Sequence, residues 1–93
     1  MIIAVDYDGT IFRDGKVNET LVSSLQAEQR KGSVIILWTC REGESLSEAV
    51  KTCALHGLRF NYINENCPAA ISMLGRNPRK IFADVYIDDK AMR

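Results

Sequence analysis

The sequence has few of the features that mark secreted or membrane proteins. It contains three cysteines, an odd number with no Cys-x-x-Cys pair, which favours reduced thiols over a disulfide framework. No apolar stretch approaches the roughly 20 residues that a membrane-spanning helix needs, so we expect no membrane partner. An apolar run begins at Ile2 and leaves no room for a leader peptide ahead of it. We therefore expect a cytoplasmic protein.

The chain also lacks an excess of charge of either sign. Its 12 Lys and Arg residues balance its 12 Asp and Glu residues, so the formal net charge is zero. It has no stripe that interleaves basic and aromatic residues, and we expect no long nucleic acid as a partner. A small anionic substrate is compatible with this balance. The 93 residues predict one small domain over 1–93, without internal repeats or linkers.

Two largely apolar runs in the chain end in acidic residues. The first run, 2–5, is followed by Asp6 and Asp8. The second run, 83–87, is followed by the pair Asp88-Asp89. Apolar runs of this kind are typical of buried parallel strands, and open α/β sheets bind their ligands at the carboxyl ends of such strands. The carboxylates can therefore form one cluster, which needs a divalent cation or a proton to be tolerable.

Strands that alternate with helices predict an α/β fold, a minimal Rossmann-like three-layer domain with a parallel sheet of about four strands in the order 3-2-1-4. The strands are expected over 2–6, 34–38, 58–63 and 84–88. The helices are expected over 19–31 with Asn18 as cap, from a capping box at Ser45 and Glu48 to about 57, and from Pro68 to about 74. The segment 7–17 is expected to be a loop, and Trp38 is expected in the core.

Four motifs, in the same order along the chain, resemble those of the haloacid dehalogenase-like superfamily. The stretch Asp6-x-Asp8-Gly9-Thr10 after an apolar strand is similar to the first motif, and Thr39 to the second. Lys80 matches the third motif, and Asp88-Asp89 matches the fourth. The resemblance is closest to small capless members, which also carry the Arg-Glu-Gly stretch present here at 41–43. The connections between the motifs have no room for a cap domain.

The resemblance implies a phosphohydrolase that hydrolyses a phosphomonoester with Mg²⁺ through an aspartyl-phosphate. Asp6 would be the nucleophile, and Asp8 would protonate the leaving oxygen and then activate water. Because a leaving halide needs no proton, Asp8 favours a phosphatase over a dehalogenase. The metal would be held by Asp6, the Asp8 carbonyl, Asp88 and, directly or through water, Asp89. The residues that would bind the phosphorylated substrate are Gly9, Thr10, Thr39, Cys40, Arg41 and Lys80, of which Thr39 and Lys80 are also catalytic.

Other functions stay open at this point. The C-terminal strand and helix usual in the superfamily are missing after Asp89, which leaves the fourth strand at the sheet edge and predicts a homo-oligomer. The same absence suits a degenerate domain that binds metal or phosphate without turnover and serves as an interaction module. A nucleotide or polynucleotide-end phosphatase is a third possibility. More simply, Asp8-Gly9 could be a hairpin turn between 4–7 and 10–13, and Arg41 could lie in a solvated loop.

Overall fold

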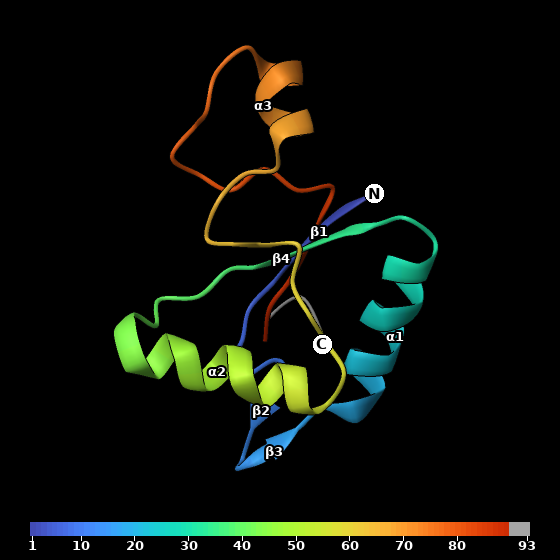
Figure 1. The fold of residues 1–93 in the computed structure, drawn as a ribbon, viewed down its shortest axis with the longest axis vertical. Helices are drawn as coiled ribbons and strands as arrows, with labels where there is room; N and C mark the ends of the chain where they lie inside the picture. The colour runs from blue at the N-terminus through green and yellow to red at the C-terminus, as the bar shows by residue number, and fades with distance from the viewer. Residues whose placement is uncertain (90–93) are drawn as a thin grey trace.

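The computed structural model describes residues 1–89 as an α/β unit around a parallel four-stranded sheet (Figure 1). Its elements are β1 (Ile2–Val5), β2 (Phe12–Arg13), β3 (Lys16–Val17), α1 (Glu19–Arg30), β4 (Val34–Leu37), α2 (Gly43–Leu55), β5 (Tyr62–Ile63), α3 (Pro68–Leu74) and β6 (Val85–Ile87). The sheet order β5-β4-β1-β6 is the predicted order, so the fold class is confirmed. The last four residues of the predicted domain, 1–93, lie outside the described part of the chain. No helix within 1–89 is long and apolar enough to cross a membrane.

The sheet is built around β1, which pairs in parallel with β4 on one side and with β6 on the other. The hydrogen bonds continue past the strand ends. The Trp38 N–H donates to the Val5 carbonyl at 2.9 Å, and the Asp6 N–H donates to the Ile87 carbonyl at 3.0 Å. Within residues 1–89, β6 pairs with β1 alone, so its outer edge is open as predicted for the fourth strand. The homo-oligomer inferred from that edge stays a prediction.

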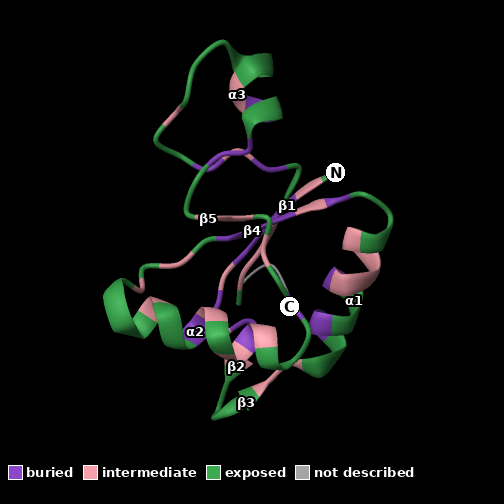
Figure 2. Ribbon diagram, in the orientation of Figure 1, coloured by how far each residue is buried: buried purple, intermediate pink, exposed green. Residues whose placement is uncertain are grey.

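The face of the sheet toward α1 and α2 holds the larger part of the core (Figure 2). Successive side chains of a strand point to opposite faces, so every second residue of β1 and β4 lies on this side. These strand residues are Ile3, Val5, Ile35 and Leu37. The helices contribute Leu21, Val22, Leu25, Ala49 and Cys53. The three residues from α1 have the spacing of one helix face, and burying such a side chain contributes roughly 1.5–3 kcal/mol.

The opposite face is covered mainly by the crossover from β5 to β6. Ala4 and Ile36 pack there against Ile81 and Ala83, which follow α3 in the chain. α3 itself stands away from the sheet, at the top of Figure 1. The third layer of this small domain is therefore an extended segment beside the strands, with its helix set apart.

Asn66 holds this crossover together. It is only 5% exposed, and its side-chain oxygen accepts a hydrogen bond from the Phe82 N–H at 2.6 Å. Its amide nitrogen donates to the carbonyls of Pro78 at 3.1 Å and Lys80 at 3.3 Å. A buried amide is stable only when its polar atoms are paired, so these bonds fix the path of the backbone that leads into β6.

The helix starts show one confirmed and one wrong prediction. The side-chain oxygen of Asn18 caps α1, as expected. The capping box at Ser45 is wrong, because α2 begins at Gly43 and has no side-chain cap hydrogen bond. The Ser45 hydroxyl instead accepts a hydrogen bond from Arg41 Nη1 at 3.2 Å. A side chain four residues earlier thus uses the group that the box would have used.

The predicted loop over 7–17 contains a small hairpin. Strands β2 and β3 are antiparallel, and the turn between them, Asp14-Gly15, has the positive φ angles of 52° and 75° that tight hairpin turns require. The alternative hairpin with Asp8-Gly9 at its turn is wrong, because β1 pairs in parallel with both of its neighbours.

The strand predicted over 58–63 is much shorter, since β5 consists of Tyr62–Ile63 alone. The Asn61 side chain explains where the strand begins. Its oxygen accepts a hydrogen bond from the Ile35 N–H at 2.8 Å, so a side chain takes the place of a backbone partner there. Leu58 is fully buried in the core, which draws the chain inward before it reaches the sheet.

Candidate active site

A pocket of about 290 Å³ lies at the carboxyl edge of the sheet. Its lining consists of Asp6, Trp38, Thr39, Cys40, Asp88 and Asp89. Five of these six are site residues named from the sequence, and Trp38 is the exception. They come from the ends of β1, β4 and β6, which is where ligands bind in open α/β sheets.

The sheet register explains why these side chains meet. One row across the sheet consists of Ala4, Ile36 and Tyr86. Two residues further along the three strands come Asp6, Trp38 and Asp88. Because side chains alternate between faces with a period of two, this second row lies on the same side as the first. Asp6 is therefore flanked by Trp38 on one side and by Asp88 on the other.

The surroundings of Asp6 disfavour its negative charge. Burial raises the pKa of its carboxyl group above the usual value, and the carboxylates of Asp8, Asp89 and Asp88 raise the pKa further. A hydrogen bond from the Tyr7 N–H opposes part of this effect. No Lys or Arg of residues 1–89 forms an ion pair with Asp6. A bound cation would therefore be favourable in this pocket.

The pocket has the right ligand types for Mg²⁺, although they are not yet gathered around one point. Magnesium takes hard oxygen ligands, and Asp6, Asp88 and Asp89 supply carboxylates to one pocket. Among residues 1–89, however, no group of three or more His, Cys, Asp and Glu side chains is placed to hold a metal ion. The donor chemistry fits the ion, and side-chain movement must bring the oxygens together. Mg²⁺ binding stays a prediction.

Asp8 is not among the residues that line the pocket, and it accepts a two-fold hydrogen bond from Arg41. The Arg41 Nε donates to Asp8 Oδ2 at 2.9 Å, and Nη2 donates to Oδ1 at 2.8 Å. Arg41 also donates to the Ser45 carbonyl at 3.1 Å and lies 4.8 Å from the centre of the Tyr7 ring. The guanidinium beside Asp8 holds the pKa of that carboxyl below its usual value. Arg41 is thus fixed by several contacts and is not simply a solvated loop residue.

Thr39 is positioned by one hydrogen bond to its side chain and one from its backbone. Its hydroxyl accepts a hydrogen bond from the Arg41 N–H at 3.2 Å, and its own N–H donates to Asn64 Oδ1 at 2.8 Å. Asn64 adopts a positive φ of 52°, which asparagine tolerates better than most residues. The sequence prediction did not include Asn64, and only its place just after β5, beside Thr39 in the sheet, indicates its role.

Lys80 is not among the residues that line the pocket. Its Nζ lies 5.7 Å from the centre of the Tyr86 ring, on the crossover side of β6. The Tyr86 hydroxyl donates to the Ile81 carbonyl and accepts from the Ala83 N–H at 3.1 Å. The Tyr86 ring thus contacts Lys80 and also contacts Trp38, which lines the pocket. The flexible Lys80 side chain would have to leave this ring to contact a phosphate in the pocket.

The prediction that Trp38 belongs to the core is wrong. Its side chain is 40% exposed and lines the pocket. The indole meets the Tyr86 ring edge to face, with ring centres 6.1 Å apart and planes at 72°. β4 ends at Leu37, so Trp38 lies just past the strand, where no further strand residue covers it. The sequence alone does not indicate this position, because the row that joins Trp38 to Asp6 depends on the register of the sheet.

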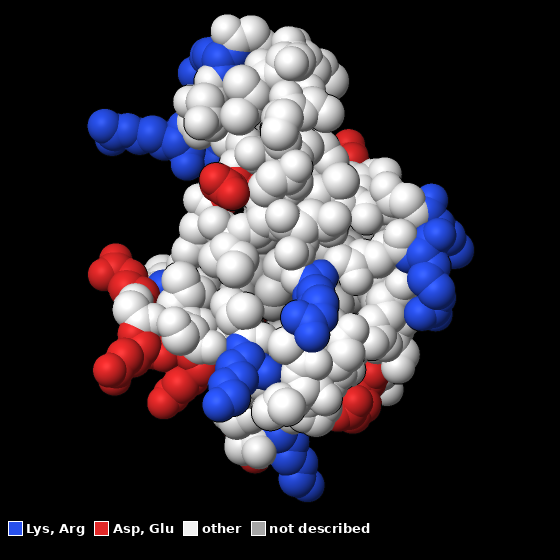
Figure 3. All heavy atoms as spheres, in the orientation of Figure 1, with Lys and Arg blue, Asp and Glu red and all other residues white. Residues whose placement is uncertain are grey.

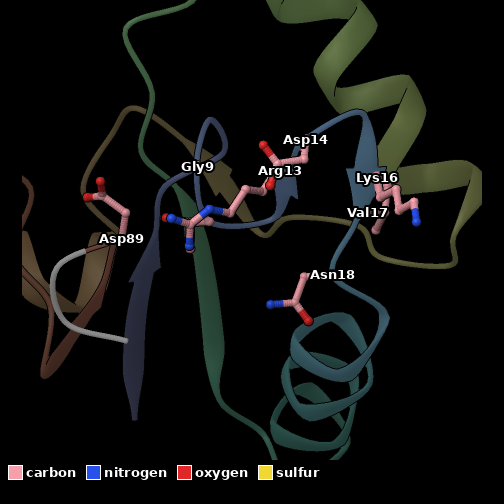
Figure 4. A pocket seen from close by; sticks show the side chains of 8 residues that line it. Gly9, Arg13, Asp14, Lys16, Val17, Asn18 and Asp89 are labelled. Carbon is pink, nitrogen blue, oxygen red and sulfur yellow. The ribbon is translucent and has the colours of Figure 1, made fainter. Parts of the chain in front are cut away.

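A second pocket, of about 610 Å³, lies beside the β2–β3 hairpin (Figure 4). It is lined by Gly9, Thr10, Arg13, Asp14, Lys16, Val17, Asn18 and Asp89. In Figure 4 the Arg13 side chain reaches across toward Asp89, whereas Lys16 points the other way. Asp89 lines both pockets. Gly9 has a φ of 81°, and a Cβ atom added at Gly9 would lie 3.7 Å from the Cβ atom of Asp89. Gly9 and Thr10 thus face this second pocket and not the one around Asp6.

Basic and acidic side chains are mixed over the face shown in Figure 3. Acidic ones gather on the left where α2 begins, whereas basic ones are spread over the face, with one group on the right near the end of α1 and another beside the acidic group. Glu44 in the first turn of α2 and Arg30 in the last turn of α1 suit the helix dipoles. These charges concern the helices, and the residues of 1–89 that line the pocket around Asp6 include no Lys or Arg.

Comparison with known proteins adds a structural relative. No family model matches this chain, and no curated protein matches it. A solved structure of a conserved protein coded by a locus of Bacteroides thetaiotaomicron is similar, with 38% sequence identity and a TM-score of 0.82. The match covers 97% of this chain and 76% of that chain. The chain therefore belongs to the same family as that protein.

Proposed function

We propose that this protein is a Mg²⁺-dependent phosphohydrolase of the haloacid dehalogenase-like type, which hydrolyses a phosphomonoester through an aspartyl-phosphate on Asp6. One observation carries the proposal. The pocket at the carboxyl edge brings Asp6 together with Thr39 and the Asp88-Asp89 pair, although these residues come from three strands that are distant in sequence. These residue types suit phosphoryl transfer, which needs a nucleophile, hydroxyl contacts to the phosphate and ligands for a cation.

In the proposed reaction, an oxygen of the Asp6 carboxylate attacks the phosphorus in line with the leaving oxygen. The bond from phosphorus to the leaving oxygen breaks while Asp8 transfers a proton to that oxygen. Asp8, now a carboxylate, takes a proton from a water molecule. The water oxygen attacks the phosphorus, and the bond to Asp6 breaks. Inorganic phosphate leaves, and both carboxyl groups return to their starting protonation states.

The residues that would hold Mg²⁺ are Asp6, the Asp8 carbonyl, Asp88 and Asp89. When bound, the ion would neutralise charge that otherwise builds up between the phosphate and the carboxylates. The unfavourable surroundings of the Asp6 charge support this part of the proposal, because burial and the carboxylates of Asp8, Asp89 and Asp88 raise its pKa.

The acid role of Asp8 requires a change of partners. A phosphate offers Arg41 the same two-oxygen geometry that the Asp8 carboxylate offers it now. We expect Arg41 to move from Asp8 to the phosphate, which frees the Asp8 carboxyl group to turn toward the leaving oxygen. Thr39 lines the pocket already, and Lys80 would approach by leaving the Tyr86 ring.

The remaining expectations accompany this function. The substrate is a phosphorylated small molecule or a nucleotide, because the chain has no net charge for holding a polymer. The location is cytoplasmic, and a homo-oligomer covers the open edge of β6 or the uncapped pocket. Within residues 1–89 the outer edge of β6 has no neighbouring strand, which supports the expected homo-oligomer.

A screen of phosphomonoesters with Mg²⁺ and with EDTA tests the proposal. We expect turnover that requires Mg²⁺ and disappears in Asp6→Asn. The binding-module alternative draws support from the Asp8–Arg41 pair and from the absence of a ready metal-ligand group within 1–89. For such a module the screen would show no turnover, while calorimetry would still detect Mg²⁺ or inorganic phosphate. That result would refute the enzymatic proposal.

A further inference from the structure

We propose that Trp38 is a platform on which the base of a nucleoside monophosphate stacks while Asp6 attacks its phosphate. The inference rests on the proposed phosphohydrolase function and names its substrate class. Trp38 is the one tryptophan of the chain, and it lines the same pocket as Asp6. Nothing in the chemistry at Asp6 itself uses an indole ring, so the position of Trp38 calls for its own explanation.

The position of Trp38 in the pocket lining indicates a role in ligand binding more clearly than its exposure does. Other large apolar side chains are more exposed, including Leu55 at 78% and Met73 at 66%, and single exposed apolar residues are common on protein surfaces. Neither of these lines the pocket. Trp38 occupies the position next to Asp6 in the sheet row, about 4.8 Å away as neighbouring strands are. That spacing suits contact with the group attached to the phosphate.

Contacts within the protein limit the motion of the indole. It packs edge to face with the Tyr86 ring, and the Tyr86 hydroxyl is held by hydrogen bonds to the backbone of Ile81 and Ala83. An aromatic ring that is already ordered loses little conformational entropy on binding. Trp38 therefore combines a water-exposed surface with a fixed position, as a stacking platform requires.

A nucleoside monophosphate fits these observations better than a plain sugar phosphate or a polymer. Its base is flat and aromatic, and stacking on an aromatic side chain works for every base because each has a π face. Its ribose separates base from phosphate, so the phosphate can lie at Asp6 while the base reaches the rim of the pocket. A long nucleic acid would need a basic track, which a chain of zero net charge does not provide.

Binding tests the inference directly. In Asp6→Asn with Mg²⁺, AMP should change the fluorescence of Trp38 and bind about 5- to 150-fold more tightly than ribose 5-phosphate, which has the same phosphate and sugar but no base. Adenosine, which lacks the phosphate, separates stacking from phosphate binding. Equal affinities for AMP and ribose 5-phosphate, with no difference in fluorescence, would overturn the inference.

Kinetics of Trp38 variants supply the second test. The ratio of kcat/KM for AMP to that for ribose 5-phosphate should fall about 5- to 150-fold in Trp38→Leu and less in Trp38→Phe, which keeps a ring. Leu55→Ala, outside the pocket lining, should leave the ratio unchanged. An unchanged ratio in Trp38→Leu would overturn the inference.

The two proposals can fail separately. If no phosphomonoester is turned over, the proposed function fails, and the AMP and ribose 5-phosphate titrations still decide whether Trp38 binds a nucleotide. If both esters are turned over at equal rates and bind equally, the phosphohydrolase stands and the nucleotide preference fails. Circular dichroism checks that each variant is folded. If Trp38→Leu does not fold, Trp38→Phe and the titrations decide.

Discussion

The two aspartates of the first motif lie two residues apart in opposite electrostatic surroundings. Asp6 lies at the pocket, where burial and three carboxylates raise its pKa. Asp8 lies outside it, where the two-fold hydrogen bond with Arg41 lowers its pKa. The proposed roles call for shifts in the opposite directions, since the nucleophile acts as a carboxylate and the acid must hold a proton. A cation at Asp6 would lower the pKa of Asp6, and an anion that takes Arg41 from Asp8 would raise the pKa of Asp8.

The largest expected effect comes from removing the nucleophile. Asp6→Asn should lower kcat by about 10⁴-fold or more, because an amide cannot form the phosphoenzyme. Steady-state assays with the best ester from the screen measure it. Asp84→Asn is the matched control at the other end of β6. Its carboxylate accepts a hydrogen bond from the Ile2 N–H at 2.7 Å, so this change should affect stability more than rate. Near-normal turnover in Asp6→Asn would rule out the covalent mechanism.

The next effect concerns the second aspartate. Asp8→Asn should lower kcat by about 10²- to 10⁴-fold, and most strongly for esters with poor leaving groups, because these depend most on protonation. Rates for a series of esters with leaving groups of rising pKa measure the slope. A loss of equal size across the series would contradict the acid role. It would then indicate that Asp8 serves mainly to hold Arg41.

Metal affinity should show a smaller effect. Asp88→Asn should weaken Mg²⁺ binding at least about tenfold, since it removes a carboxylate oxygen from the pocket beside Asp6. Isothermal calorimetry of wild type and variant measures the difference. Asp14→Asn changes a carboxylate that lines the hairpin pocket instead, and should leave the affinity as it is. Equal affinity in wild type and Asp88→Asn would refute the predicted metal site.

The smallest effects are on stability, and they should differ in sign between the two aspartates. Without Mg²⁺ at pH 7, Asp6→Asn should raise the free energy of unfolding, because the raised pKa of Asp6 means that its charge opposes folding. That difference should shrink as the pH falls toward 3.8 and Asp6 gains its proton. Asp8→Asn should lower stability by about 0.2–1 kcal/mol, as is usual for exposed ion pairs.

The pH dependence of the Asp8 contribution follows from its lowered pKa. The contribution is present above the usual aspartate value of 3.8 and is lost as the pH falls below it through the folded-state pKa. Urea unfolding at pH 7, pH 5 and pH 3 in EDTA measures both aspartate variants. The same sign for the two substitutions at pH 7 would contradict the electrostatic contrast between the two sites.

Much of the fold could be predicted from the sequence. Apolar runs specify where strands lie, Asn18 specifies the start of α1, and alternation of strands and helices specifies a parallel sheet. The predictions that failed depend on which partner a polar side chain takes. The Ser45 hydroxyl accepts from Arg41, four residues earlier, instead of capping α2, and the Asn61 side chain replaces a strand partner of Ile35. Residue patterns do not specify which of several possible partners such a side chain takes.

The sequence by itself determined that Asp6, Thr39 and Asp88 would gather at one edge, because strand polarity sends the carboxyl ends of parallel strands to the same side. Only the tertiary structure decided how their neighbours are used. It placed Trp38 in the pocket wall, paired Asp8 with Arg41 and left Lys80 over the Tyr86 ring. The physical reason is that periodicity sets the face on which a side chain lies, whereas its partner depends on sheet register and on the path of the crossovers.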